Sequence, residues 1–128
     1  MKVVFIIVLI VVVLHHVFPL IQVIGDSMYP TYLDGEIIVG TKLYRKSKLK
    51  KGDVVLYQSP TDDKTVIKRI DQIEKRSGVL YFYCLGDNPP HSYDSRNYGF
   101  VSSKNFVCKV INQRRNINDV CNQKRRNS

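Results

Sequence analysis

The sequence predicts a mostly β fold, a compact β-barrel or sandwich, behind one N-terminal transmembrane helix. Three observations lead to this prediction. The first two dozen positions are almost all apolar, the chain beyond them contains short runs rich in Val, Ile, Tyr and Phe, and turn-forming residues separate those runs. Its 128 residues leave room for one domain behind the helix.

The apolar segment extends from Val3 to Ile24. Its second half is interrupted by His15, His16, Pro19 and Gln22. As a helix this segment would be about 33 Å long, which matches the hydrocarbon core of a bilayer. A cleaved signal peptide needs small residues at its cleavage site, whereas this chain contains no alanine. A buried soluble helix needs more core than so short a chain provides. We therefore predict that residues 1–24 form an uncleaved membrane anchor.

The charges that flank the apolar segment predict its orientation. Lys2 and the α-amino group precede it, acidic residues follow it, and the first basic residue after it is Lys42. The flank with more Lys and Arg stays in the cytosol. We therefore predict a single-pass membrane protein whose partner is the lipid bilayer. Its N-terminus would be cytosolic, and the chain from residue 25 onward would lie on the extracytoplasmic side.

Residues 25–112 are predicted to form the β-rich domain. Runs of β-forming residues alternate there with turns that contain Gly, Pro, Asp or Asn. No stretch after Ile24 has helical periodicity, and no internal repeat is evident. The expected strands lie at residues 36–40, 53–57, 65–73, 79–86 and 105–111.

The chain is strongly basic, with 20 Lys and Arg against 11 Asp and Glu and a formal net charge of +9. The positive charge gathers in residues 42–51 and in residues 113–128, which we predict to be a flexible tail. One interpretation is that both stretches are ordinary solvated surface. The other is that they are attracted to anionic lipid head groups, which would orient an anchored domain rather than recruit it. No nucleic-acid partner is expected.

The three cysteines, Cys84, Cys108 and Cys121, do not form a C-x-x-C pair, so we expect no metal site and no cofactor. In an exported domain two of them could form a disulfide and leave one thiol, and the sequence does not say which two. The alternative interpretation is that Cys84 and Cys108, which lie in apolar runs, are buried small hydrophobic residues.

The candidate nucleophile is Ser27, which lies between a glycine and a proline just after the apolar segment. A serine nucleophile needs a base. His91 is the only histidine outside the apolar segment, and Lys68 is the alternative. Strand alternation places Lys68 on the same face as Val66 and Ile70, where an apolar residue is expected. Burial there would favour the neutral amine, which can accept a proton.

Four segments of the chain resemble the boxes of the type I signal peptidase family, in a minimal form with a Ser-Lys dyad. Residues 25–31 (GDSMYPT) resemble the nucleophile box, and residues 51–60 (KGDVVLYQSP) resemble the Gly-Asp strand box. Residues 66–70 (VIKRI) resemble the lysine box. Residues 86–101, with GDN, SYDSR and GFV, resemble the last box. The four occur in the family's order, behind an apolar N-terminal segment.

The resemblance implies roles for individual residues. Ser27 would attack the scissile carbonyl, with its own backbone N–H as one oxyanion donor. Lys68 would be neutral in the resting enzyme and take the hydroxyl proton. Ser92 would hydrogen-bond the Lys68 amine, and Asp94 and Arg96 would form an ion pair that fixes the nearby loop.

The resemblance also implies a function. The chain would be a membrane-bound serine endopeptidase that removes N-terminal signal peptides from exported precursor proteins. It would cleave after small residues and act as a monomer without a cofactor. An extended peptide can add to a sheet edge, with alternate side chains entering pockets. Val23 and Ile67, beside the two catalytic positions, are the expected walls of those pockets.

The chain departs from the family pattern at two places. Gly25 stands where some members carry a serine that acts as a second oxyanion donor, and no Gly-Asp follows Arg69. Several alternatives therefore stay open, namely a Ser-Lys maturation peptidase with a narrow substrate range, an inactive homologue and a basic membrane-anchored binding protein. A self-cleaving repressor is disfavoured because the chain has no Ala-Gly or Cys-Gly dipeptide and no helix-turn-helix pattern.

Overall fold

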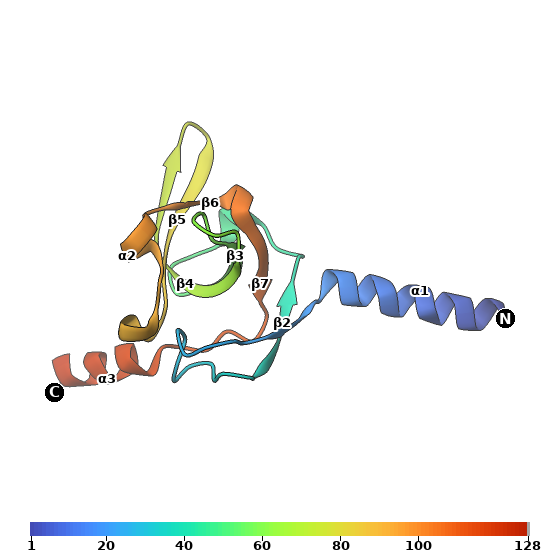
Figure 1. Cartoon of the computed structure of the whole chain (residues 1–128), viewed down its shortest axis with the longest axis horizontal. Coiled ribbons are helices and arrows are strands. Elements are labelled where there is room, and N and C mark those ends of the chain that lie inside the picture. Colours follow the sequence, from blue (N-terminus) through green and yellow to red (C-terminus); the bar gives the residue numbers. More distant parts are fainter. Residues whose placement is uncertain (128) are drawn as a thin grey trace.

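The computed structural model describes residues 1–127 and is built around one seven-stranded antiparallel sheet, with a helix projecting at each end of the chain (Figure 1). The mostly β architecture confirms the predicted fold class at that level. The strands, in the order in which they lie side by side, are β1 (Leu20–Gln22), β2 (Ile37–Thr41), β7 (Phe106–Val110), β3 (Val54–Gln58), β4 (Thr65–Arg76), β5 (Val79–Leu85) and β6 (Val101–Ser102). The helices are α1 (Lys2–Val17), α2 (Ser95–Tyr98) and α3 (Ile117–Arg126).

Strand β3 lies at the centre of the core because it is buried on both faces. Val54 and Leu56 belong to one hydrophobic cluster, and Val55 and Tyr57 belong to a second. This explains why the strand is an unbroken apolar run rather than an alternation of apolar and polar residues. The loop that carries Ser27 packs on the first cluster, which contains Met28.

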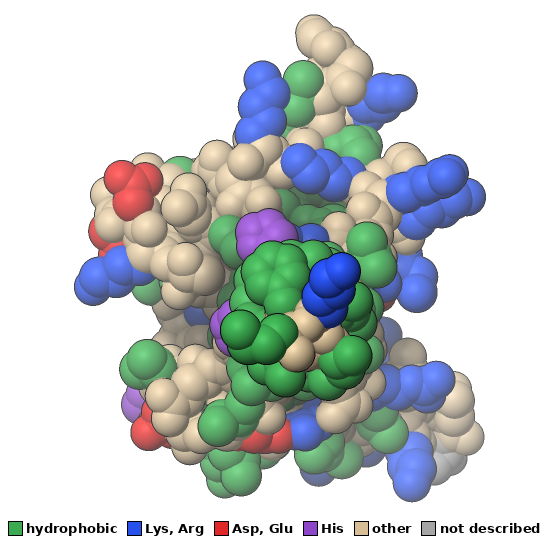
Figure 2. Space-filling model, turned by 90° about the vertical axis from the view of Figure 1, so that its right-hand side faces the viewer, with side chains coloured by type: hydrophobic (Ala, Val, Ile, Leu, Met, Phe, Trp, Pro, Cys, Tyr) green, Lys and Arg blue, Asp and Glu red, His purple; other side chains and the backbone are tan. Residues whose placement is uncertain are grey.

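Helix α1 is shorter than the predicted anchor over residues 1–24. It ends at Val17, and Phe18 leaves the helical conformation because it precedes Pro19, which disfavours helix in the residue before it. The next residues form β1 and pair with β2, Ile21 opposite Ile38. None of the side chains of α1 is buried, and hydrophobic groups cover it when it is seen end-on in Figure 2. No helix among residues 1–127 combines the length and apolar character needed to cross a membrane.

The first residues of the predicted tail, residues 113–128, make side-chain contacts with the domain. The Gln113 side-chain amide exchanges two hydrogen bonds with the backbone of Val54, at 2.7 and 3.0 Å. Arg114 forms an ion pair with Glu36 and stacks 4.9 Å from the ring centre of Tyr32. Polar side chains make these contacts, so an apolar periodicity could not predict them. Helix α3 follows, and Ser128 lies outside the described residues.

Cys84 and Cys108 are buried free thiols, which confirms their interpretation as small hydrophobic residues. Cys84 packs in the second cluster and Cys108 in the first. The third cysteine, Cys121, is an exposed free thiol on α3. The cysteines of the described chain therefore form no disulfide.

Candidate active site

Ser27 and Lys68 line the same pocket, which has a volume of about 410 Å³. One wall is formed by Ile21, Gln22 and residues 24–27, and the other is the start of β4 from Thr65 to Lys68. The structure thus brings together the two residues that the sequence singled out as nucleophile and base. His91, the alternative base, also lines this pocket and is exposed.

The loop of Ser27 is held by its backbone. The Ser27 carbonyl oxygen accepts a hydrogen bond from the Asn88 N–H at 2.9 Å, and the Asp26 carbonyl oxygen accepts one from the Asn88 side-chain amide, also at 2.9 Å. The Gly25 N–H donates to the Asp34 carboxylate at 2.8 Å. Gly25 has a φ of 86°, a left-handed conformation that suits glycine. These contacts fix the turn around a side chain that remains half-buried.

Lys68 is buried, with only 4% of its surface exposed. It lies on the face of β4 where Val66 and Ile70 pack against the second cluster, as strand alternation predicted. Burial lowers the pKa of the Lys68 amine, and the negative charge of Asp94 opposes this only in part. A low pKa increases the fraction of neutral amine, which is the form that can act as a base.

The Lys68 amine has no hydrogen-bond partner in the part of the chain that the structure describes. In that same part, no buried side-chain nitrogen or oxygen lacks a hydrogen bond. The amine must therefore open onto the pocket that Lys68 lines. In this position it can exchange a proton with a group that enters the pocket.

Ser92, Asp94 and Arg96 form one hydrogen-bonded group. Asp94 is fully buried, and its carboxylate accepts from the Ser92 hydroxyl at 2.6 Å, from the Gly86 N–H at 2.9 Å and from the Arg96 Nε at 2.9 Å. Burial alone would raise the pKa of Asp94, but the hydrogen bonds from Arg96, Ser92 and Gly86 outweigh it and lower the pKa to about 2. The predicted Asp94–Arg96 ion pair is present.

The partner of Ser92 differs from the expected one. Its hydroxyl donates to Asp94, and within residues 1–127 no hydrogen bond joins Ser92 to Lys68. Asp94 attracts that proton because it is a buried carboxylate that needs donors. This bond ties Ser92 to Asp94, whose negative charge raises the pKa of Lys68 more than any other charge does.

The close contacts of Gly86 could not be predicted from the sequence. A Cβ atom at this position would lie 2.1 Å from the Ser92 hydroxyl and 2.6 Å from the Ser27 carbonyl oxygen. Only a residue without a side chain fits where the chain passes between these two segments. Its place in a Gly-Asp-Asn turn suggested a bend but not this close approach.

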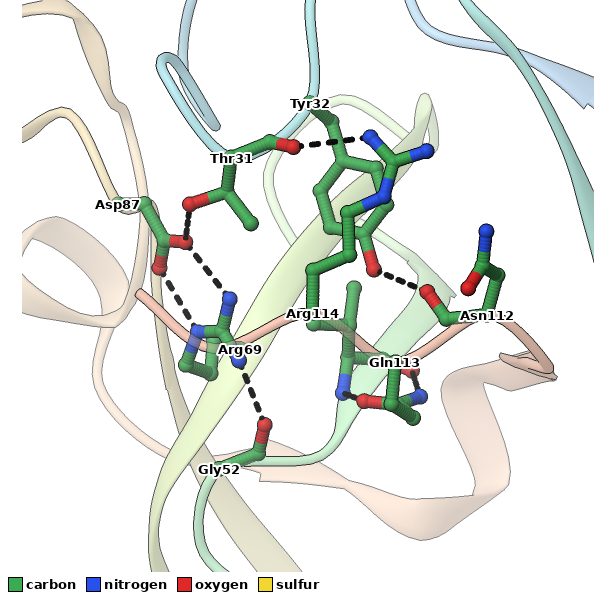
Figure 3. A network of polar contacts seen from close by, with 9 residues as sticks. Thr31, Tyr32, Gly52, Arg69, Asp87, Asn112, Gln113 and Arg114 are labelled. Carbon is green, nitrogen blue, oxygen red and sulfur yellow. Dashed lines mark hydrogen bonds and ion pairs between the residues drawn. The ribbon is translucent and has the colours of Figure 1, made fainter. Parts of the chain in front are cut away.

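A second feature that could not be predicted is the ion pair between Arg69 and Asp87, which is drawn in Figure 3. Two Arg69 nitrogens donate to the Asp87 carboxylate at 2.9 and 2.7 Å, and a third donates to the Gly52 carbonyl at 2.8 Å. The Thr31 hydroxyl donates to the same carboxylate at 2.6 Å. Arg69 follows Lys68, so this network joins the strand of the lysine to the loop of Ser27.

The two expected pocket walls lie in different places. Ile67 lines the pocket, and it is buried. Val23 packs in the first cluster and is not among the residues that line the pocket. The Val23 backbone bonds instead to Glu36 and Gly35, at 2.8 and 2.7 Å, and so turns its side chain inward.

Open strand edges flank the pocket. Strand β4 pairs with β3 along Thr65–Arg69 but pairs with β5 only from Arg69 onward, so residues 65–68 have one neighbouring strand. Strand β1 has β2 as its one neighbour in the sheet that the structure describes. Unpaired backbone groups on such edges can bind an extended peptide. The pocket between them therefore combines a peptide-binding geometry with a hydroxyl and a buried amine.

Two comparisons with known proteins agree with this geometry. Residues 1–82 match the family described as signal peptidase, peptidase S26. The match includes Ser27 and Lys68 and ends before Ser92. Mitochondrial inner membrane protease subunit 1 of Schizosaccharomyces pombe is 34% identical over 105 residues, which covers 68% of this chain and 67% of that protein.

Proposed function

This chain belongs to the S26 family of signal peptidases, and we propose that it is a membrane-attached serine endopeptidase that removes N-terminal signal peptides from exported precursor proteins. The observation that carries the proposal is the pocket that Ser27 and Lys68 both line, with the lysine buried beside it. A structural lysine on that face would need an acidic partner, and no carboxylate of the described residues forms an ion pair with it.

In the proposed mechanism, neutral Lys68 accepts the proton of the Ser27 hydroxyl while the oxygen attacks the scissile carbonyl. The backbone N–H of Ser27 donates to the oxygen that becomes negative. The protonated amine then gives its proton to the leaving nitrogen as the peptide bond breaks. Water, deprotonated by Lys68, hydrolyses the acyl-enzyme and restores the serine.

Gly25 offers no hydroxyl as a second oxyanion donor. A backbone N–H or a water molecule would have to supply it. The hydrogen bond from Ser92 helps to keep Asp94 ionised, and the charge of Asp94 acts on Lys68. In this proposal Asp94 and Arg96 position the loop and take no part in proton transfer.

We propose that the substrate binds as an extended strand between the open edges of β1 and β4. Its alternate side chains would then face the pocket wall at Ile67. A shallow apolar wall of this kind suits small side chains next to the scissile bond. Val23 would act indirectly, by supporting the wall from within the core.

We propose that α1 attaches the enzyme to the membrane, with its N-terminus on the cytosolic side and the catalytic domain on the other. The support is the helix itself, which has apolar residues from Val3 to Leu14 and buries none of them in the domain. A signal peptide also has an apolar segment, so attachment would concentrate enzyme and substrate on one surface.

The test is cleavage of a precursor with a small-x-small site by the purified full chain. We expect product from the wild type and at least a roughly thousandfold loss in Ser27→Ala and Lys68→Ala. The matched controls are Ser47→Ala and Lys75→Ala, which change exposed residues outside the pocket and should cleave normally. The relative from Schizosaccharomyces pombe is named as a subunit, so the assay of this chain alone also tests whether it acts without a second kind of subunit.

Three outcomes would contradict the proposal. Cleavage that survives in Ser27→Ala would exclude this nucleophile. Cleavage that survives in Lys68→Ala but is lost in His91→Ala would move the base to His91. A wild type that binds the precursor and never cleaves it would identify an inactive homologue.

A further inference from the structure

A basic segment, residues 42–48 (KLYRKSK), begins where helix α1 ends. The Lys42 N–H donates to the carbonyl oxygen of Val17, the last residue of α1, at 2.9 Å. Two residues earlier, the Gly40 N–H donates to the Pro19 carbonyl oxygen at 2.8 Å. These bonds fix the start of the segment against the end of the helix that joins the domain.

Two apolar side chains hold the segment on the sheet. Leu49, just beyond it, is buried in the second cluster, and Tyr44 packs against the same cluster. Between them lies a 3-10 turn, Lys46–Lys48, in which the Lys48 N–H donates to the Arg45 carbonyl at 2.9 Å. The anchoring turns the charged side chains outward, and it leaves Leu43 70% exposed.

Four cations of the segment have no acidic partner within ion-pair distance among residues 1–127. They are Lys42, Arg45, Lys46 and Lys48, and all are exposed. The next two lysines differ, because Lys50 pairs with Asp53 at 3.5 Å and Lys51 with Asp71 at 3.6 Å. Four like charges within seven residues repel one another, and an external anion would relieve that repulsion.

The face from which α1 projects has an uneven charge. In Figure 2, which looks along α1, most Lys and Arg side chains lie above and to the right of the helix, whereas Asp and Glu lie mainly to the left and below. A membrane entered by α1 would meet this face.

We propose that residues 42–48 bind the anionic head groups of the membrane to which α1 attaches. This inference rests on the membrane attachment in the proposed function. The four cations would pair with lipid phosphates, while Leu43 would reach the boundary with the acyl chains. A single helix can still rotate about its axis and tilt in the bilayer, and the domain fixed to its end would move with it. The second contact fixes that orientation, and with it the direction in which the active-site pocket faces.

The first test measures partition of the full chain between buffer and vesicles. One set of vesicles is phosphatidylcholine, and in the other about a quarter of the lipid is phosphatidylglycerol. We expect partition to be about tenfold or more higher in the anionic vesicles at low ionic strength, with a decline as salt is added. The variant Lys42→Gln/Arg45→Gln/Lys46→Gln/Lys48→Gln should lose this preference. Its matched control, Lys75→Gln/Lys104→Gln/Lys124→Gln/Arg126→Gln, removes the same charge at exposed sites elsewhere and should keep it.

The second test locates the contact. The chain contains no tryptophan, so Leu43→Trp introduces a single probe within the segment. We expect a spin label on the lipid head groups to quench this probe in anionic vesicles. The same label should leave Ile73→Trp, on the β4–β5 hairpin, unquenched.

Three results would overturn the inference. They are equal loss of lipid preference in the two quadruple variants, an unquenched Leu43→Trp, and a preference for single-stranded RNA over anionic vesicles at equal phosphate concentration. Cleavage of a soluble peptide in detergent separates this inference from the proposed function. The segment variant should cleave normally there. A wild type that prefers anionic vesicles but cleaves nothing would refute the peptidase and leave the lipid surface standing.

Discussion

The backbone of Asn88 holds the backbone of Ser27 through a 2.9 Å hydrogen bond, so the two segments touch at the residue that bears the candidate nucleophile. Gly86, two residues earlier, lies against the same Ser27 carbonyl and against Ser92. The chain from Gly86 to Asn88 is therefore a spacer between the nucleophile and the loop that carries Asp94. The space that residues 86–88 occupy therefore sets the position of Ser27 relative to the rest of the pocket.

Gly86→Ala should separate these segments. The added methyl group would meet Ser92 and the Ser27 carbonyl at distances under 3 Å, so one of them must move. A displacement of about 1 Å in an active site can reduce the rate about a hundredfold. We expect a loss of that size in the cleavage rate. Gly35→Ala is the control, because no atom lies within 4 Å of the added carbon. Its φ of 82° is left-handed, whereas that of Gly86 is not, so backbone strain cannot explain a slower Gly86→Ala. Equal rates in the two variants would show that the contact is dispensable.

The cleavage rate should rise with pH through the pKa of Lys68. Only the neutral amine can accept the Ser27 proton, so activity falls as acid protonates it. Burial lowers this pKa, so activity should persist to a lower pH than an exposed lysine, with a pKa of about 10.4, would allow. The measurement is kcat/KM across the pH range with a neutral peptide. A rate that is flat with pH, or that falls toward alkaline pH, would exclude Lys68 as the base.

Lys68→Met should stabilise the fold at neutral pH. The folded state lowers the pKa of this amine, so a proton binds more weakly to Lys68 in the folded chain than in the unfolded chain. The penalty is full below the folded pKa and shrinks as pH rises, because the unfolded chain then holds more protons. It vanishes above the pKa of an unfolded lysine, about 10.4. Urea unfolding at several pH values should show the difference between variant and wild type narrowing toward alkaline pH. A constant difference would mean that packing, not charge, causes it.

Arg69→Met should destabilise the domain. It would leave Asp87, whose side chain is 2% exposed, as a buried charge without its ion-pair partner. Breaking a buried pair in this way costs about 3–5 kcal/mol. The double variant Arg69→Met/Asp87→Leu should recover part of that loss, since it removes both charges. Urea unfolding of all four proteins in a double-mutant cycle gives the coupling energy. Simple additivity of the two changes would contradict the pairing.

Asp94→Asn should destabilise the fold, and the loss of stability should be smallest at acid pH. The folded pKa of Asp94 is about 2, against an ordinary value of 3.8. The carboxylate therefore stabilises the fold above pH 4, and this contribution is lost as pH falls toward 2. At neutral pH we expect the variant to unfold at lower urea concentration than the wild type, and we expect the gap to close as pH approaches 2. A gap that stays constant through that range would mean that the charge of Asp94 is not what stabilises the loop.

The parts of the fold that could be predicted are those that local pattern determines. The apolar runs and turns located the main strands, and alternation placed Lys68 on the face of Val66 and Ile70. The end of α1 was predicted less well, because four further apolar residues after Pro19, at positions 20, 21, 23 and 24, resembled a continuation of the helix. Pairing with β2 turned the start of that stretch into a strand instead.

The parts that could not be predicted depend on contacts between distant segments. The ion pair of Arg69 and Asp87 needs β4 and the turn after β5 to be side by side, and the register between those strands shifts after Ile70. Ser92 illustrates the same limit. The resemblance to the signal peptidases implied a hydrogen bond to Lys68, but the direction of the Ser92 hydroxyl depends on the burial of Asp94.

Strand β7 lies between β2 and β3, although the whole β4–β5 hairpin precedes it in the chain. Until the ribosome has released Val110, β2 and β3 each expose an unpaired edge to the surrounding solution. Such edges recruit other chains and promote aggregation. The nascent domain can therefore gain its final stability only after β7 has been translated. A stop codon placed before β7 would leave a sheet split at its centre, however intact the segments that carry Ser27 and Lys68.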